Sequence, residues 1–404
     1  MERRPGTLAA FRSRDFRLLW GGQTISFVGD AAFVVALGWR VTDMTHRASA
    51  LGFALSLESV AMLTTLLIGG VLADRYPRRP LMIGSDLARA AVMAAFLAVD
   101  ASGHLTFTWV LVLAALFGFG DGFFQPAFSG IVPLVVETPM LPSANSWLGI
   151  ARQGSAVVGP AIAATLYGTV GPVVVWGIDA GSFVVSAAAL WVARPRAGAP
   201  AEQLGLRREL AEGFNYVRSV PWIWTGIGAA TVILMVAMAP YTALLPRVVQ
   251  HHYHRGVGSY GLLFSAMAVG MVAGSLAWAK WHPRRFRVAI CFGSFGINDL
   301  GIIVLALTPW YPLAVAAAVW RGIWIGVGGA AWTTLVTELV PEHLLSRVFS
   351  FDIFGSFALT PVGFAAAGAV AAVIAPTTIL AVGGALGFCL WFVPLAWGRV
   401  RTAA

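Results

Sequence analysis

The feature that most constrains the fold is a succession of long apolar segments separated by short polar breaks. A helix that crosses the hydrocarbon core of a bilayer needs about 20 mainly apolar residues. Hydrophobic residues make up 58% of the 404 positions and charged residues only 11%, which is more apolar surface than a soluble core needs. The pattern therefore predicts an all-α membrane protein with twelve transmembrane helices, at residues 17–43, 51–73, 81–101, 107–132, 144–169, 171–193, 221–246, 257–280, 288–307, 310–337, 347–373 and 376–398.

The distribution of positive charge predicts the orientation of these helices. An even number of helices places both termini on the same side of the membrane. If that side is the cytoplasm, cytoplasmic segments hold 20 of the 27 Lys and Arg residues and external loops hold four. This asymmetry is the positive-inside bias of membrane proteins. It accounts for the net charge of +9, so we expect cytoplasmic termini and no nucleic-acid partner.

One long polar connection divides the chain into two halves. We expect a six-helix bundle at 1–193, a cytoplasmic linker at 194–220 and a second six-helix bundle at 221–404. Two pairs of segments are similar across the halves: GGVLADRYPRRPL with GSLAWAKWHPRRFRV, and GFGDGFFQPAFSGIVPLVVE with GIWIGVGGAAWTTLVTELVPE. Parallel repeats of six helices are typical of secondary transporters, whose substrate site lies near mid-membrane at the interface of the repeats.

The loop GGVLADRYPRRPLM, after the second helix, resembles the signature G-x-x-x-D-R-x-G-R-R/K of the major facilitator superfamily. Pro77 stands where that signature usually has glycine. Longer stretches resemble the drug-proton antiporter family 3, which includes macrolide-efflux proteins and a siderophore exporter: FRLLWGGQTISFVGD, SDLARA, FFQPAFSGIVPLVV, ARQGSAVVGPA and PEHLLSRVFS. The residues that match the loop signature are Gly70, Asp74, Arg75, Arg78 and Arg79, and those that resemble, incompletely, the Gly-Pro element of antiporters in helix 5 are Gly154, Gly159 and Pro160.

The resemblance implies a mechanical role for the loop. It places Asp74 opposite the start of the eleventh helix, near Ser346 to Val348, where free backbone N–H groups carry partial positive charge. Such a contact exists only while the cytoplasmic side is closed, so it would act as a latch between the halves. Arg78 could pair with Glu137, which lies in a loop without Lys or Arg. The alternative is that the arginines of the loop only set topology.

Ionisable residues within the predicted helices are candidates for a transport site, because a charge inside the membrane is costly unless it faces a cavity or a partner. Asp30 lies near the middle of the first helix and shares a face with Gln23 and Val34. The resemblance to the superfamily implies that helices 1, 4, 7 and 10 line a central cavity. There Asp30 could exchange protons or bind a cationic substrate, and we expect Gln23 to line the same cavity. The alternative is a structural hydrogen bond to another helix.

The other ionisable residues fall into two groups. Arg152, in the fifth helix, could form a salt bridge with Asp30 or Asp121 that protonation releases, or a static ion pair. Asp121 and Arg321, on helices 4 and 10, are candidate substrate contacts, whereas Glu58 is either a substrate contact or a partner of another helix. We expect mainly structural roles for the rest: Asp86 and Arg89 as a local i, i+3 pair, Asp179 and Asp299 on peripheral helices, and Asp352 near the inner surface, where it could belong to the latch.

These observations favour a secondary active transporter that exports hydrophobic or cationic small molecules by proton antiport. A dedicated metabolite transporter, either a siderophore exporter or a nutrient importer, is the alternative on the same fold. An integral-membrane enzyme or sensor is a remote third hypothesis. The sequence lacks G-x-x-x-x-G-K-[ST], H-E-x-x-H and G-x-S-x-G, so we expect neither ATP coupling nor an enzyme.

The expected partners follow from this hypothesis. They are a small-molecule substrate, protons and the lipid bilayer, with the proton gradient as the coupling energy and no cofactor. The HHYH run at 251–254 has no further metal ligands clustered nearby in the sequence, so we expect no metal site. We expect a monomeric, multi-pass protein of the bacterial inner or plasma membrane.

Overall fold

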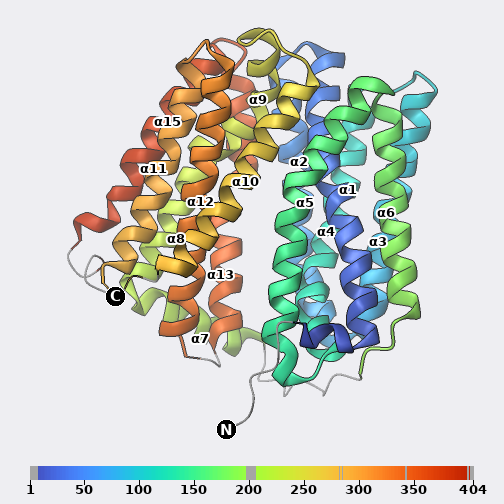
Figure 1. Cartoon of the computed structure of the whole chain (residues 1–404), viewed down its shortest axis with the longest axis vertical. Helices are drawn as coiled ribbons and strands as arrows, with labels where there is room; N and C mark the ends of the chain where they lie inside the picture. The colour runs from blue at the N-terminus through green and yellow to red at the C-terminus, as the bar shows by residue number, and fades with distance from the viewer. Residues whose placement is uncertain are drawn as a thin grey trace. The chain divides into compact units, whose positions relative to one another are not determined.

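The computed structural model describes the backbone of residues 8–196, 206–281, 283, 285–341, 344–397 and 400, and nearly all regular structure in these ranges is helical (Figure 1). The contacts divide the chain into two compact units, each described here by itself. Unit 1 comprises Met1–His46, Leu57–Ala201 and Val257–Gly261, and unit 2 comprises Arg47–Ser56, Glu202–Gly256 and Leu262–Ala404.

The long helices follow the apolar segments of the sequence. Short 3-10 helices precede or follow some of them, at Ala9–Arg12, Thr138–Met140 and Pro394–Ala396. The first six helices are α1 (Arg14–Thr45), α2 (Ala48–Arg75), α3 (Arg78–Ala101), α4 (Phe107–Val135), α5 (Leu141–Thr169) and α6 (Pro172–Val192). The later ones are α7 (Leu206–Ser219), α8 (Pro221–Ile233), a π-helix (Leu234–Met238), α9 (Ala239–His251), α10 (Val257–Trp281), α11 (Arg287–Leu307), α12 (Tyr311–Leu339), α13 (Leu345–Phe357), α14 (Thr360–Val370) and α15 (Pro376–Phe392).

Eleven helices in the described part of the chain are long and apolar enough to cross a membrane. All twelve segments predicted from the sequence are largely helical, but α5 is not among the eleven. Its 29 residues give it sufficient length, at about 1.5 Å per residue. Its first half is comparatively polar, with the sequence SANSWLGIARQGS. The eleven spans support a multi-pass membrane protein, and the twelfth span stays a prediction.

Three local features were not predicted from the sequence. The linker contains α7, which is separated from α8 by the single residue Val220. The seventh predicted segment is continuous from Pro221 to His251 but contains a π-helix, and the eleventh is divided into α13 and α14 by a turn at Ala358 and Leu359. Pro361 follows that turn and supplies no backbone N–H. A hydropathy profile shows how long an apolar segment is but not its backbone conformation, so it does not reveal such interruptions.

Glycines at the contacts between helices let neighbouring helices approach closely within each unit. In unit 1, a Cβ atom on Gly118 of α4 would lie 2.1 Å from the Glu58 carbonyl oxygen of α2. In unit 2, a Cβ on Gly322 of α12 would lie 1.9 Å from the Met267 carbonyl oxygen of α10. Small residues at helix interfaces allow this close backbone packing in membranes. The same type of contact therefore occurs at corresponding positions of the similar segments in α4 and α12.

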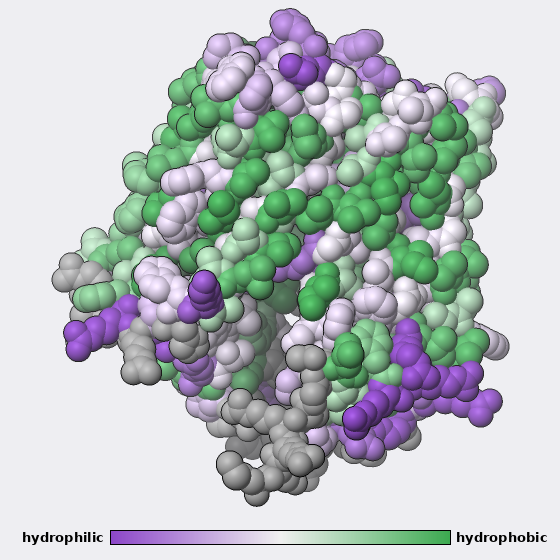
Figure 2. Space-filling view, in the orientation of Figure 1, coloured by the Kyte–Doolittle hydropathy of each residue, from purple (hydrophilic) through white to green (hydrophobic). Residues whose placement is uncertain are grey.

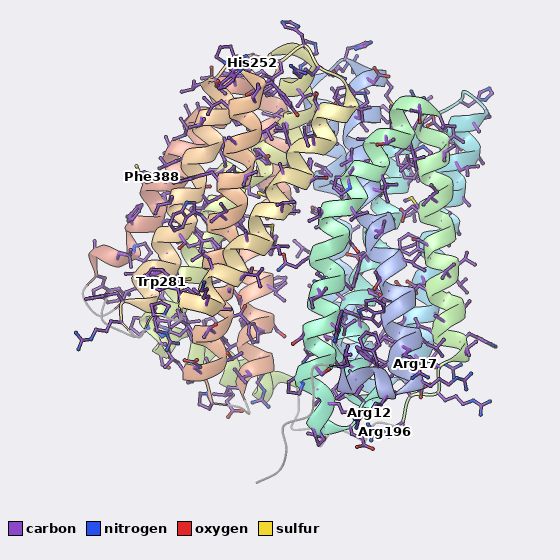
Figure 3. All side chains as sticks on the ribbon, in the orientation of Figure 1. Arg12, Arg17, Arg196, His252, Trp281 and Phe388 are labelled. Atoms are coloured by element: carbon purple, nitrogen blue, oxygen red, sulfur yellow. The ribbon has the colours of Figure 1, made fainter. Side chains whose placement is uncertain are left out.

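Charged residues gather at the ends of the helices. Hydrophobic residues cover much of the middle of the face in Figure 2, and Figure 3 places Arg12, Arg17 and Arg196 at the same end of unit 1. The Arg17 guanidinium donates to the carbonyl of Phe11 at 2.6 Å, and that of Arg196 donates to the carbonyl of Val136. These guanidiniums therefore satisfy backbone carbonyls at the end of unit 1 where α1 begins and α6 ends.

The other end of α1 is fixed by a different set of polar contacts. Arg40 of α1 pairs with Asp100 of α3 at 2.5 Å, and the indole nitrogen of Trp176 of α6 donates to the same carboxylate at 2.9 Å. The Asp100 side chain is buried. One carboxylate thus joins three helices, and it fixes the relative positions of α1, α3 and α6 around the residues described next.

Candidate functional site

A buried arginine lies at the centre of unit 1. The side chain of Arg89, on α3, is 1% exposed. Its guanidinium carbon lies 4.3 Å from the centroid of the Phe124 ring and 4.3 Å from that of the Phe183 ring. Cation–π contacts of this kind stabilise a desolvated guanidinium. The two rings, from α4 and α6, therefore hold the cation between them.

Three carboxylates from three helices surround this guanidinium. Asp86 of α3 lies 2.7 Å from the Arg89 Nη2 atom. Asp121 of α4 and Asp30 of α1 both approach the Nη1 atom, at 3.3 Å and 3.9 Å. The predicted local pair of Asp86 and Arg89 is thus one edge of a larger cluster. We call Arg89 with Asp30, Asp86 and Asp121 the Arg89 cluster.

Asp86 is the most firmly held carboxylate of the Arg89 cluster. Its second oxygen accepts a hydrogen bond from the Ser186 hydroxyl of α6 at 2.6 Å. Ser186 in turn accepts one from the side-chain amide of Gln23 at 2.7 Å. Gln23 is fully buried, so it joins α1 to α6 here, whereas we expected it to line a cavity. The amide nitrogen of Gln23 is thus used in helix packing, whereas its buried Oε1 atom accepts no hydrogen bond from the described residues.

The other two carboxylates of the cluster are partly accessible. The side chain of Asp30 is 34% exposed and that of Asp121 is 22% exposed, whereas that of Asp86 is fully buried. Gln125, one turn along α4, donates to Asp121 at 3.4 Å. Asp30 and Asp121 are therefore the two carboxylates of the cluster whose side chains are left partly uncovered, although the Oδ1 atom of Asp30 that faces Arg89 is itself buried.

Two further carboxylates act on this region through their charge. Glu58 of α2 interacts electrostatically with Asp121 and Asp30, and Asp179 of α6 interacts with Asp30. One buried oxygen of Glu58 and one of Asp179 accept no hydrogen bond from the described residues. Uncompensated carboxylates are costly in a low-dielectric interior. At this site the carboxylates therefore outnumber the one buried guanidinium.

Arg152 does not occupy the position that we proposed for it. It is exposed on α5, and its guanidinium carbon lies 5.1 Å from the centroid of the Phe27 ring. The ion pairs that Asp30 and Asp121 form within the described residues are both with Arg89. Arg152 still acts on Asp30 through its charge. The direct salt bridge that we expected between Arg152 and these carboxylates is therefore absent from this structure.

Two arginines of the signature loop, Arg78 and Arg79, bind carbonyls near the C-terminal ends of helices in unit 1. Arg78 donates to the carbonyl of Gly130 in α4, and the Arg79 Nε atom donates to the carbonyl of Leu190 in α6 at 2.8 Å. Cations at carbonyl-rich helix C-termini are favourable. Glu137 is exposed, and the expected pair between Arg78 and Glu137 does not occur among the described contacts.

Two residues of the predicted latch are Asp74 and Ser346. The side chains of Asp74 and Ser346 lie outside the described residues, so their proposed contact stays a prediction. Arg75 is exposed at the end of α2, and a Cβ atom on Gly70 would meet no heavy atom within 4 Å.

The Gly-Pro element of α5 has a clear packing role. A Cβ atom on Gly159 would lie 2.6 Å from the Ala31 side chain and 2.8 Å from the Val28 carbonyl oxygen of α1. Pro160 is buried as well, whereas Gly154 is exposed. Gly159 therefore allows α5 to approach α1 one residue from Asp30.

Unit 2 contains a second buried arginine. The Arg321 guanidinium carbon, on α12, lies 3.8 Å from the centroid of the Tyr241 ring of α9, and Arg321 is 1% exposed. It attracts Asp299 of α11 through its charge, and Asn298 donates to Asp299 at 2.8 Å. Arg321, proposed as a substrate contact, is thus enclosed by helix packing in this structure. Asp352 of α13 accepts hydrogen bonds from Trp332 at 2.7 Å and Ser356 at 3.2 Å within the same unit.

The histidine run at 251–254 is bound to neighbouring backbone. The His252 Nε2 atom lies 2.8 Å from the Thr308 carbonyl oxygen, and the His251 Nδ1 atom lies 3.2 Å from that of Arg247. Tyr253 donates to the Leu305 carbonyl, and burial raises the pKa of its hydroxyl. Among the described residues, no group of three or more His, Cys, Asp or Glu side chains could hold a metal ion.

The central position of Arg89 is not evident from its place in the sequence. One clue was available, because a guanidinium carries five N–H donors and a single partner three residues away cannot satisfy them. A second partner for Arg89, on another helix, was therefore required. The sequence does not show which helix supplies it, since that depends on how the helices are rotated against one another.

We expect Gly118→Ala to destabilise unit 1. The added Cβ would overlap the Glu58 carbonyl of α2, and overpacking typically costs about 1–3 kcal/mol. The measurement is the melting temperature of the purified protein in detergent. Gly149→Ala on α5 is the matched control, because its Cβ would meet nothing within 4 Å and alanine favours helix. An unchanged melting temperature for Gly118→Ala would contradict the proposed close packing of α2 on α4.

Known proteins resemble this chain over most of its length. Macrolide efflux protein A of Streptococcus pyogenes is 25% identical over 347 residues, which cover 83% of this chain and 84% of that protein. Enterobactin exporter EntS of Citrobacter koseri is 27% identical over 382 residues, covering 91% of this chain and 88% of that protein. These relatives confirm the resemblance to macrolide-efflux proteins and to a siderophore exporter.

Solved structures share the fold at low sequence identity. A bacterial homolog of the human lysosomal transporter Spinster, inward-facing and unoccupied, has a TM-score of 0.72 at 14% identity, covering 96% of this chain and 98% of that one. A bacterial homologue of the iron transporter ferroportin, inward-facing, has a TM-score of 0.72 at 14% identity, covering 95% and 99%. A family model described as Major Facilitator Superfamily matches residues 19–363, and the chain therefore belongs to this superfamily of membrane transporters.

Proposed function

We propose that this chain exports hydrophobic or cationic small molecules in exchange for protons, by alternating access. The superfamily and the efflux and export relatives support transport out of the cell. The observation that carries the proton-coupling part is the Arg89 cluster, in which two partly exposed carboxylates share one buried cation. Such a site can gain or lose a proton while the guanidinium keeps a partner.

The charge of the site supports a preference for cations. Asp30, Asp121 and Glu58 come from α1, α4 and α2 and interact through their charges. A cationic substrate can replace a proton at such a group, since both reduce the excess of negative charge. An anionic substrate would be repelled. Partly buried aromatic rings near the site, including Phe27, could add cation–π contacts to a substrate.

The proposal also includes the number of membrane spans, their orientation and the cellular location of the protein. We propose twelve spans in two six-helix bundles at 1–193 and 221–404, joined by a cytoplasmic linker at 194–220. The basic end of unit 1 would face the cytoplasm, as the positive-inside bias predicts. The protein would work as a monomer in a bacterial plasma membrane, without an enzymatic activity and with the proton gradient in place of a cofactor. Arg75, Arg78 and Arg79 would act with Asp74 at the cytoplasmic side.

Export of one endogenous metabolite is the second candidate function. It is favoured by the similarity to an enterobactin exporter, which is as extensive as that to the macrolide efflux protein. Both candidates use the same fold and the same direction of transport. They differ in the range of compounds that the protein accepts.

The two candidates are distinguished in a bacterial host that lacks its own efflux pumps. Cells with and without the protein are compared for accumulation of a panel of cationic dyes, neutral antibiotics and acidic compounds. We expect lower accumulation of several cationic or neutral compounds and a return to control levels with a protonophore. Lower accumulation that a protonophore does not affect would contradict proton coupling. An effect on no compound in the panel would favour the dedicated exporter and overturn the multidrug proposal.

A further inference from the structure

The two ends of the Arg89 guanidinium have different surroundings. The Nη2 atom faces Asp86, which is fully buried and held by Ser186. The Nη1 atom faces Asp121 at 3.3 Å and Asp30 at 3.9 Å. The rings of Phe124 and Phe183 restrict rotation of the guanidinium plane. One end of the cation is therefore fixed, and the other is shared by two accessible carboxylates.

We propose that Asp30 and Asp121 compete for the Nη1 end of Arg89, so that Asp121 controls how tightly Asp30 holds its proton. This inference rests on the proposed proton exchange at Asp30. Asp121 is closer to the guanidinium and also accepts from Gln125, so it is the stronger competitor. Asp30 lies farther from the guanidinium and its side chain is more exposed. Its Oδ1 atom, which faces Arg89, accepts no hydrogen bond from the described residues.

The competition allows a proton to enter without exposing an unpaired charge. When Asp30 takes up a proton, Arg89 keeps Asp121 and Asp86. When Asp30 releases it, the new carboxylate is attracted by the same guanidinium. Breaking a buried pair outright is strongly destabilising, because one charge is left uncompensated. Sharing the cation avoids that step in both protonation states.

Each of the helices α2 to α6 contributes a charged or titratable group that interacts with Asp30 through its charge. These groups attract or repel the Asp30 carboxylate, and Arg89 and Asp121 are the two that the proposal uses. The full set is Glu58 on α2, Asp86 and Arg89 on α3, Asp121 on α4, Arg152 on α5 and Asp179 on α6.

The test is an infrared titration of the purified protein, which requires no substrate and no transport. The carboxylic-acid C=O band that disappears in Asp30→Asn reports the protonation of Asp30. We expect Asp121→Asn to move the midpoint of that band to lower pH by about one unit or more, because Asp30 gains the Nη1 end of Arg89 and loses a repelling neighbour. Glu58→Gln is the matched control. It removes a nearby carboxylate that has no ion pair with Arg89 among the described contacts, so its shift is expected to be smaller.

Arg89→Lys provides a second test, in which the midpoint of the Asp30 titration is expected to move in the opposite direction. A lysine ammonium cannot hold partners at two separate nitrogens. It would stay with the buried Asp86, and the Asp30 midpoint would move to higher pH. Equal shifts for Asp121→Asn and Glu58→Gln, or no shift in either, would overturn the competition. A failed transport assay together with the expected infrared shifts would refute proton-coupled export and leave the competition intact.

Discussion

Replacing Asp30 by Asn abolishes proton-driven efflux in our account, and accumulation returns to that of cells without the protein. Asparagine has nearly the same shape but cannot bind and release a proton. The fold is expected to survive, because Arg89 keeps Asp86 and Asp121 as partners. The measurement is dye accumulation at matched expression, with and without a protonophore.

The matched control for Asp30→Asn lies on the same helix. Asp43→Asn makes the same chemical change at an exposed position of α1 and is expected to transport like the wild type. Efflux that survives in Asp30→Asn and still collapses with a protonophore would keep the exporter but remove Asp30 from the essential coupling. Loss of efflux in both variants would point to a general effect on α1.

We expect the replacement of Arg89 by Met to prevent most of the protein from folding stably. The substitution leaves Asp86 buried without its cation, and breaking a buried pair typically costs about 3–5 kcal/mol. It also removes the guanidinium from between Phe124 and Phe183. The measurements are the yield of monodisperse protein in detergent and its melting temperature. Arg152→Met, the same change on the exposed face of α5, is expected to alter both much less.

A double variant separates the charge effect from lost packing. Arg89→Met with Asp86→Asn removes the buried anion together with its cation, so part of the stability should return. A stable Arg89→Met protein, or a double variant no more stable than the single one, would contradict the view that Arg89 neutralises buried carboxylates.

The helices could be predicted from the sequence because the bilayer demands long apolar segments. Each of the twelve segments lies largely in helix, including α5, whose polar first half keeps it out of the eleven strongly apolar spans. The break before Pro361 and the π-helix at Leu234–Met238 depend on local backbone hydrogen bonding. Mean hydropathy is insensitive to both. The helix in the linker was missed because it is neither long nor apolar.

The candidate site was predicted only in part, for a geometric reason. Asp30 and Asp121 were identified because each is an isolated carboxylate in an apolar helix. Their cation was assigned to Arg152, but it is Arg89 in this structure. Spacing along one helix reveals the pair of Asp86 and Arg89, whereas contacts between helices depend on rotations that one sequence does not specify.

The central claim, exchange of substrate for protons, is tested most directly in proteoliposomes that contain a pH-sensitive dye. An imposed pH gradient should drive accumulation of a compound identified in the cell assay. Conversely, a gradient of that compound should move protons in the opposite direction, with neither effect in Asp30→Asn. Transport of the compound without any proton movement, and without any response to the pH gradient, would contradict the account.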